Sequence, residues 1–282
     1  MVSYFQAIVL GLLQGFSELF PISSLGHSVL IPMLLRWNID QSSDAFLSFL
    51  VLTHLSTALV LLGFFWRDWV AIVSGVLRSL AARQIKTEDT YAKIGWLIVV
   101  STIPAGILGI LFEQRLKDLF SAADIIATAL ILNGIALYGV EWLRKRHAEE
   151  GAYDDQKLAG MSWSKSVVIG VAQCLALIPG FSRTGMTIAG GLVSGLSHDN
   201  AARYSFLLAT PIILAAAVLK VPDLFANGAT GLPTALVGAV CSAASAYLSV
   251  RFLLRYFETR TLTPFAIYCF VAGCLALVLI RL

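Results

Sequence analysis

The chain has 282 residues, of which 58% are hydrophobic and only 13% are charged, and its mean hydropathy is +0.81. A soluble domain carries about 25% charged residues, so the composition excludes an ordinary soluble protein and predicts that a lipid bilayer surrounds the chain. The formal net charge of +3 is spread over short segments between apolar ones, which excludes the basic surface that nucleic-acid binding requires.

The N-terminal apolar segment is interrupted near its middle. It has no Lys or Arg before the first apolar run and no small-residue cleavage site, so we expect it to stay in the mature protein. The run Phe20-Pro21-Ile22-Ser23-Ser24-Leu25-Gly26 then breaks any helix, because Pro clashes with the preceding turn and Gly and Ser favour turns. Irregular backbone at membrane depth is tolerated only where protein buries it or water reaches it, which predicts a re-entrant helical hairpin.

Glu18 lies just before this break, in a stretch that contains no other charge, and Gln14 lies one helical turn earlier on the same face. An ionisable residue within an apolar segment is a functional hypothesis by default, because leaving it unpaired in lipid is costly. The alternative is a structural hydrogen-bonded pair that locks helix packing. His54, in the next apolar segment, is a candidate on the same grounds.

Ser23, Ser24, Gly26 and His27 follow the first break. Successive backbone N–H groups at such a turn can form an anion-binding nest, and a hydroxyl beside an imidazole can supply a nucleophile with its base. The alternative is ordinary capping of the next helix by Ser, which would be preferred if this run stood alone in the sequence.

Six apolar segments are predicted to cross the membrane. Four lack Asp, Glu, Lys and Arg and are near or above the ~20 residues that a spanning helix needs: residues 45–66, 94–112, 224–250 and 261–280. Two shorter segments, residues 125–140 and 204–219, can span if flanking side chains snorkel.

Basic residues between these segments predict the orientation. The loop of residues 67–93 and the stretch of residues 144–165 are rich in Lys and Arg, so both are expected to be cytoplasmic, with the two termini outside. The loop that carries Arg251, Arg255 and Arg260 then also falls inside, which agrees. Arg115 and Lys117 fall outside, which disagrees.

An internal repeat divides the chain into two units. Residues Gly11, Gln14, Ser23 and Gly26 recur at one constant offset as Gly170, Gln173, Ser182 and Gly185. Each unit has one re-entrant hairpin and three crossings, an arrangement that reverses direction, so residues 1–160 and 161–282 are predicted to form an inverted-topology repeat. The expected fold is therefore one all-α polytopic membrane domain with its two breaks face to face near the midplane.

The second break, Pro179-Gly180-Phe181-Ser182-Arg183-Thr184-Gly185, contains the guanidinium that is best suited to bidentate phosphate recognition. With the first break it provides a carboxylate, hydroxyls, an imidazole and a cation where lipid meets water. This set of groups suits phosphoryl transfer from a lipid phosphate, which depends mainly on positioning and charge neutralisation. A plain Glu18–Arg183 salt bridge is the chief alternative.

The motifs resemble those of the bacterial undecaprenyl-diphosphate phosphatase family, also called the bacitracin-resistance family. They read Gln14-Gly-Phe-Ser-Glu18, Pro21-Ile-Ser-Ser-Leu-Gly-His27 and Pro179-Gly-Phe-Ser-Arg183-Thr-Gly185, and the similarity spans nearly the whole chain. The sequence departs from the family pattern at Leu25, where the family usually has Thr, and at Gln14, where many members have a second Glu.

The resemblance implies that the protein converts undecaprenyl diphosphate to undecaprenyl phosphate, which recycles the lipid carrier for cell-wall synthesis and gives bacitracin resistance. It implies Ser24 as nucleophile, His27 as its acid/base partner, Glu18 as an acid/base or metal-assisting group and Arg183 as pyrophosphate clamp. The implied substrate-binding residues are Gln14, Ser23, Gly26, Gly180, Ser182 and Thr184. The resemblance also implies a bacterial inner-membrane location, a site open to the outer side and a divalent cation, Mg²⁺ or Ca²⁺; a homodimer stays open.

Two other classes of protein share parts of this pattern. Inverted repeats with broken helices are typical of secondary transporters, in which Glu18 or His54 would carry protons, and a lipid-phosphate flippase is a related alternative. Vanadium-haloperoxidase-like lipid phosphatases need a His and an Asp soon after the Arg. Here His198 and Asp199 are expected in a loop, which argues against that class.

Overall fold

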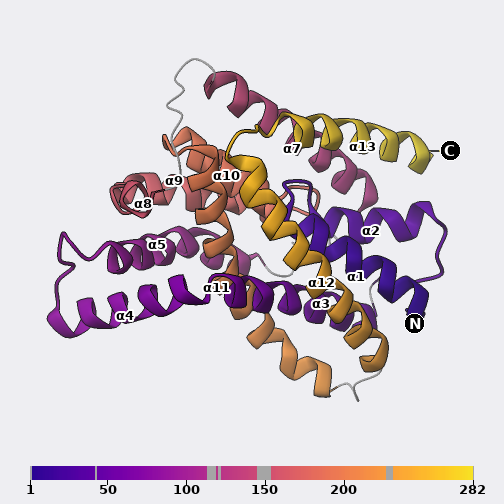
Figure 1. The fold of residues 1–282 in the computed structure, drawn as a ribbon. Coiled ribbons are helices and arrows are strands. Elements are labelled where there is room, and N and C mark those ends of the chain that lie inside the picture. Colours follow the sequence, from indigo (N-terminus) through magenta and orange to yellow (C-terminus); the bar gives the residue numbers. More distant parts are fainter. Residues whose placement is uncertain are drawn as a thin grey trace.

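The computed structural model describes residues 2–41, 43–112, 119, 122–144, 154–226 and 231–281. All regular secondary structure in these ranges is helical, so the predicted all-α class is confirmed (Figure 1). The elements are α1 (Tyr4–Leu19), α2 (Ser24–Leu34), α3 (Asp44–Phe64), α4 (Trp66–Ala82), α5 (Thr90–Leu111), α7 (Ala123–Arg144), α8 (Asp155–Ala159), α9 (Trp163–Cys174), the 3-10 turn η1 (Leu175–Leu177), α10 (Arg183–Val193), α11 (His198–Ala226), α12 (Leu232–Phe257) and α13 (Thr263–Arg281).

Six of the described helices are long and apolar enough to cross a membrane, as predicted: α3, α5, α7, α11, α12 and α13. The two segments that seemed short in the sequence are full-length helices. The spanning part of α7 has 22 residues and that of α11 has 21, because the helices continue through the charged residues at their ends. The chain is thus a multi-pass membrane protein.

The prediction of a loop over residues 67–93 is wrong for most of that segment, since α4 occupies Trp66–Ala82. The helix packs lengthwise against α5, and a Cβ atom added at Gly75 would lie 2.6 Å from the backbone nitrogen of Ala92. The basic side chains lie on the exposed face of α4 and are compatible with a helix. Its small residues allow the close contact with α5. Arg115, Lys117 and residues 145–153 of the second basic stretch lie outside the described residues.

Each predicted break joins two helices that pack against each other, α1 with α2 and α9 with α10 (Figure 1). The helices after the breaks are both 11 residues long, and they begin and end at the same constant offset. Their caps are equivalent, because Ser23 Oγ accepts from the Gly26 N–H at 3.2 Å and Ser182 Oγ accepts from the Gly185 N–H at 3.1 Å. Capping by Ser is therefore present in both breaks.

The first helix of each pair packs on a helix from the other half of the chain, α1 on α12 and α9 on α5. Glycines make this contact close. A Cβ added at Gly11 would lie 2.3 Å from the carbonyl oxygen of Gly238, and one added at Gly170 would lie 2.6 Å from that of Ser101. Such small-residue contacts let helix backbones approach in a membrane protein. The two halves of the chain are therefore interleaved.

Asn133 of α7 connects the two breaks. Its side-chain nitrogen donates to the Pro21 carbonyl at 3.2 Å, and its side-chain oxygen accepts from the Ser182 N–H at 3.0 Å. The Asn133 side chain is fully buried. One side chain thus provides hydrogen bonds to backbone groups of both breaks that have no partner within a helix, and this holds the two turns side by side.

Candidate active site

The buried carboxylate of Glu18, at the end of α1, is the centre of a polar cluster. Its Oε2 accepts from Ser24 Oγ at 2.5 Å and from Gln14 Nε2 at 3.0 Å, and lies 3.3 Å from His54 Nε2. Its Oε1 forms an ion pair with the Arg183 guanidinium. Residues from α1, α2, α3 and α10 therefore meet at one carboxyl group.

Arg183 begins α10, directly after the Ser182 cap. The sequence predicted that the repeat would bring it to Glu18, and the structure confirms that contact through Arg183 Nη2. The side chain stays 20% exposed, and a guanidinium has further N–H donors beyond the one used here. The salt bridge considered as the alternative to a phosphate site thus exists, but it leaves Arg183 with donors for an incoming anion.

His27 does not have the partner that the sequence predicted. Its Nδ1 lies 2.6 Å from the Ser23 carbonyl oxygen and its Nε2 lies 2.7 Å from the hydroxyl of Tyr268 on α13. The hydroxyl of Ser24 donates to Glu18 instead. Ser24 and His27 are therefore not hydrogen-bonded to each other, because the bond to the Ser23 carbonyl directs the imidazole ring toward α13; the acid/base role of His27 stays a prediction.

His54 is the site residue that the sequence analysis undervalued. Its Nδ1 lies 2.7 Å from the Leu50 carbonyl one turn earlier in α3, which leaves Nε2 to face Glu18. The sequence signal was an imidazole within a segment that has no charged residue. It identified His54 as a candidate but did not show which side of α3 faces α1.

The hydroxyls of the second break bind the backbone of the first. Thr184 Oγ1 donates to the Glu18 carbonyl at 2.8 Å, and Ser182 Oγ donates to the Phe20 carbonyl at 3.4 Å. Gly180 has a φ of 106°, and a Cβ atom there would lie 2.3 Å from the Ile126 carbonyl oxygen, so the turn requires glycine. The structure assigns these residues a role in joining the breaks, and phosphate binding by them stays a prediction.

The expectation of a loop at His198 and Asp199 is wrong, because α11 begins at His198. His198 Nε2 lies 2.6 Å from Glu141 Oε1 of α7, and the ring also contacts Arg144. Its described hydrogen-bond partners thus belong to α7 rather than to the Glu18 cluster. The haloperoxidase-like arrangement, which needs this His beside the phosphate-binding Arg, has no support.

The donor groups at Glu18 do not fit a cation held by the protein alone. Among the described residues, no group of three or more His, Cys, Asp or Glu side chains is close enough together to hold a metal ion. Gln14 Oε1 is buried without a hydrogen-bond partner in the described part of the chain and is one available oxygen. A Mg²⁺ or Ca²⁺ ion takes six or more oxygens, so most would have to come from elsewhere.

The sequence model of the family described as Bacitracin resistance protein BacA matches residues 7–275. An undecaprenyl-diphosphatase of Mycolicibacterium paratuberculosis is 49% identical over 100% of this chain and 98% of its own. Undecaprenyl-diphosphatase 2 of Burkholderia ambifaria is 45% identical over 94% of this chain and 93% of its own, and the undecaprenyl-diphosphatase of Acidiphilium cryptum is 44% identical over 97% of each. The chain therefore belongs to the bacitracin resistance protein BacA family.

Proposed function

We propose that the protein is an undecaprenyl-diphosphatase that converts undecaprenyl diphosphate to undecaprenyl phosphate, and so returns the carrier lipid to cell-wall synthesis and gives resistance to bacitracin. The observation that carries the proposal is the meeting of Ser24, His54 and Arg183 at the buried Glu18 carboxylate. The names of full-length relatives support the same activity. They do not favour the alternative of a secondary transporter or flippase.

Charge at the two helix breaks supports the binding of a diphosphate. The N-termini of α2 and α10 begin at Ser24 and Arg183, so the positive ends of two helix dipoles lie beside the guanidinium. Arg183 binds the phosphoryl oxygens through the N–H groups that Glu18 does not use. This neutralises the charge that develops on the transferred phosphoryl group and on the departing lipid phosphate.

Ser24 is the nucleophile in this mechanism, and Glu18 takes over the base role that was expected of His27. The Ser24 hydroxyl, already 2.5 Å from Glu18, attacks the terminal phosphorus. The new Oγ–P bond forms as the P–O bond to the bridging oxygen breaks, undecaprenyl phosphate leaves and Glu18 receives the proton. His54, 18% exposed beside Glu18, passes that proton to solvent.

Water completes the reaction in a second step. Its oxygen attacks the phosphorus of phosphoserine, the Oγ–P bond breaks and inorganic phosphate leaves. Glu18 takes a proton from the water and returns it to Ser24 Oγ, so both residues regain their starting state. Among the described residues, no three His, Cys, Asp or Glu side chains lie close enough together to hold a metal ion, and no step here depends on one. A Mg²⁺ or Ca²⁺ ion that assists the enzyme would be bound mainly by the substrate phosphates.

The membrane placement is also part of the proposal. Two re-entrant hairpins meet in an inverted-topology repeat, in the inner membrane of a bacterium, and the site opens to the outer side. The constant sequence offset between the two breaks and the matching Ser capping bonds support the repeat. So does the packing of α1 and α9, each of which lies on a helix from the other half of the chain. A homodimer is a further prediction.

Phosphate release from undecaprenyl diphosphate by purified protein in detergent tests the function. Without any gradient, the wild type is expected to release phosphate, and Arg183→Ala is expected to lose about a hundredfold or more of kcat/KM. Arg203→Ala is the matched control, because Arg203 is as exposed as Arg183, at 20%, and pairs with Asp68 outside the site. Absence of release from folded wild-type protein, with or without Mg²⁺ or Ca²⁺, would contradict the proposal and return transport as the better interpretation.

A further inference from the structure

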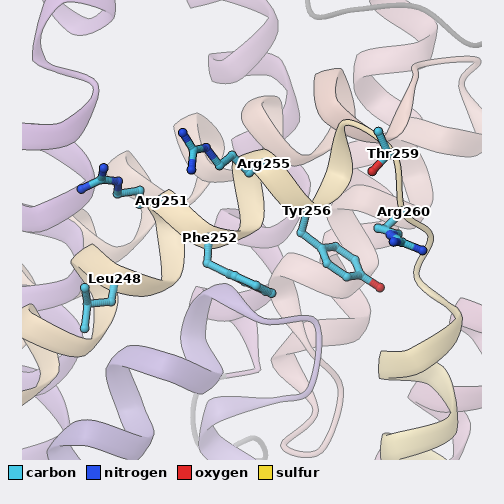
Figure 2. A pocket seen from close by; sticks show the side chains of 7 residues that line it. All are labelled: Leu248, Arg251, Phe252, Arg255, Tyr256, Thr259 and Arg260. Atoms are coloured by element: carbon cyan, nitrogen blue, oxygen red, sulfur yellow. The ribbon is translucent and has the colours of Figure 1, made fainter.

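A second feature, separate from the Glu18 cluster, is a hollow of about 430 Å³ at the C-terminal end of α12 (Figure 2). It begins on the last turns of the helix and ends in the connection to α13. The lining residues are Leu248, Arg251, Phe252, Arg255, Tyr256, Thr259 and Arg260. None of them belongs to the proposed catalytic set.

The hollow is strongly basic. Arg251 and Arg255 lie one turn apart on the same face of α12, as Figure 2 shows, and Arg260 lines the other end. Like charges at this spacing repel each other. Among the described residues, no carboxylate forms an ion pair with any of the three, whereas Arg78 is paired with Asp89. Three exposed guanidinium groups thus line one hollow without an ion-pair partner in the part of the chain that the structure describes.

The other half of the lining is apolar. Leu248 is 66% exposed and precedes the arginines along α12, and Phe252 is 53% exposed and lies between Arg251 and Arg255. Phe252 stacks on Tyr256 with ring centroids 5.7 Å apart, and the Tyr256 hydroxyl donates to the Thr261 carbonyl at 3.1 Å. The aromatic floor of the hollow is therefore fixed in place.

We propose that this hollow binds the phosphate-bearing headgroup of an anionic membrane lipid. The planar forks of Arg251, Arg255 and Arg260 match phosphate oxygens, and Leu248 and Phe252 contact the first carbons of the lipid chains. The site lies at the end of a membrane-spanning helix, where headgroups are found. A soluble phosphate ion would make no favourable contact with the apolar half of the lining.

A second hollow on the same molecule provides a contrast. It has a volume of about 570 Å³, lies along α4 and α5, and its lining, from Trp69 to Pro211, contains no charged residue. That groove suits lipid chains of any kind, because nothing in it selects a headgroup. Of the two hollows, we therefore expect only the one on α12 to select lipids by their headgroup.

The test measures lipid binding to the full-length protein by native mass spectrometry, after incorporation into phosphatidylcholine nanodiscs that contain a set fraction of phosphatidylglycerol. The double variant Arg251→Gln/Arg255→Gln is expected to retain phosphatidylglycerol about tenfold less well than the wild type. Arg67→Gln is the matched control, since it removes an exposed arginine from α4 and should leave retention unchanged. Equal retention by the double variant and the wild type would overturn the proposal.

Competition distinguishes a lipid site from a phosphate site. Millimolar inorganic phosphate is expected to leave phosphatidylglycerol bound to the wild type, and displacement by phosphate at that concentration would overturn the lipid assignment. The release of phosphate from undecaprenyl diphosphate is measured on the same samples and should be unchanged in the double variant. The lipid proposal and the phosphatase proposal can thus fail independently.

Discussion

The two broken turns share the same capping hydrogen bond but differ in chemistry. Ser23 and Ser182 cap equivalent helices with nearly identical hydrogen bonds, yet the residue after the cap is a hydroxyl donor in one copy, Ser24, and a cation in the other, Arg183. Glu18 has Leu177 as its counterpart. The comparison teaches that a duplicated turn can divide a reaction, with the nucleophile and base on one copy and the phosphate clamp on the other.

The largest expected effect separates Ser24 from its neighbouring cap. Ser24→Ala should reduce phosphate release by about a thousandfold or more, because it removes the attacking oxygen, whereas Ser23→Ala should cost far less. Trapping of labelled phosphoserine in rapidly quenched reactions provides the direct measurement. Equal losses in the two variants would instead favour direct attack by water.

The second prediction concerns the two imidazoles. His54→Gln should lower kcat by about a hundredfold, because His54 is the group that relays the proton from Glu18, and His27→Gln should lower it less. Single-turnover rates measured for both variants, beside Tyr268→Phe, which removes only the partner of His27, give the comparison. If His27→Gln proved the more damaging, the base would have to be reassigned to His27.

A smaller effect is expected from Arg183→Lys. Lysine keeps the positive charge but lacks the planar fork, so it can pair with Glu18 or with one phosphate oxygen but not with two. We expect a loss in kcat/KM of about tenfold, between the wild type and Arg183→Ala. Activity of Arg183→Lys at the wild-type level would show that charge alone suffices at the second turn.

The smallest effect on chemistry, and a clear one on stability, is expected for Asn133→Ala. The change leaves the Pro21 carbonyl and the Ser182 N–H without their described partner, and each buried unsatisfied group costs about 1–3 kcal/mol. Thermal unfolding in detergent should show a lower midpoint than for the wild type. Thr128→Ala, which removes an exposed hydroxyl from the same helix, should leave the midpoint unchanged.

Much of the fold could be predicted from local features. Charge-free segments predicted the six candidate spans, and Pro, Gly and Ser predicted both breaks. The contact between Glu18 and Arg183 could also be predicted, because the repeat places their turns together and a buried charge needs a partner. These features depend on composition and spacing, which can be read directly from the sequence.

The errors concern the choice between partners that lie far apart in the sequence. The short spacing between Ser24 and His27 favoured a pair, yet His27 turns toward Tyr268 and His54 takes the place beside Glu18. The rotation of α3 about its axis decides this, and a sequence pattern does not fix that rotation. Charge in the segment of α4 similarly suggested a loop, although close contact at Gly75 supports a helix.

The interleaving of the halves has a consequence for synthesis of the protein. Helix α1 packs on α12, and Glu18 is paired with Arg183. Because both partners lie in the second half of the chain, the first unit leaves the ribosome before they have been synthesised. During that interval its broken turn and carboxylate depend on water, lipid headgroups or an insertion factor. Two halves expressed as separate chains should therefore each be short-lived in the membrane and should stabilise each other when made together, as pulse-chase labelling would reveal.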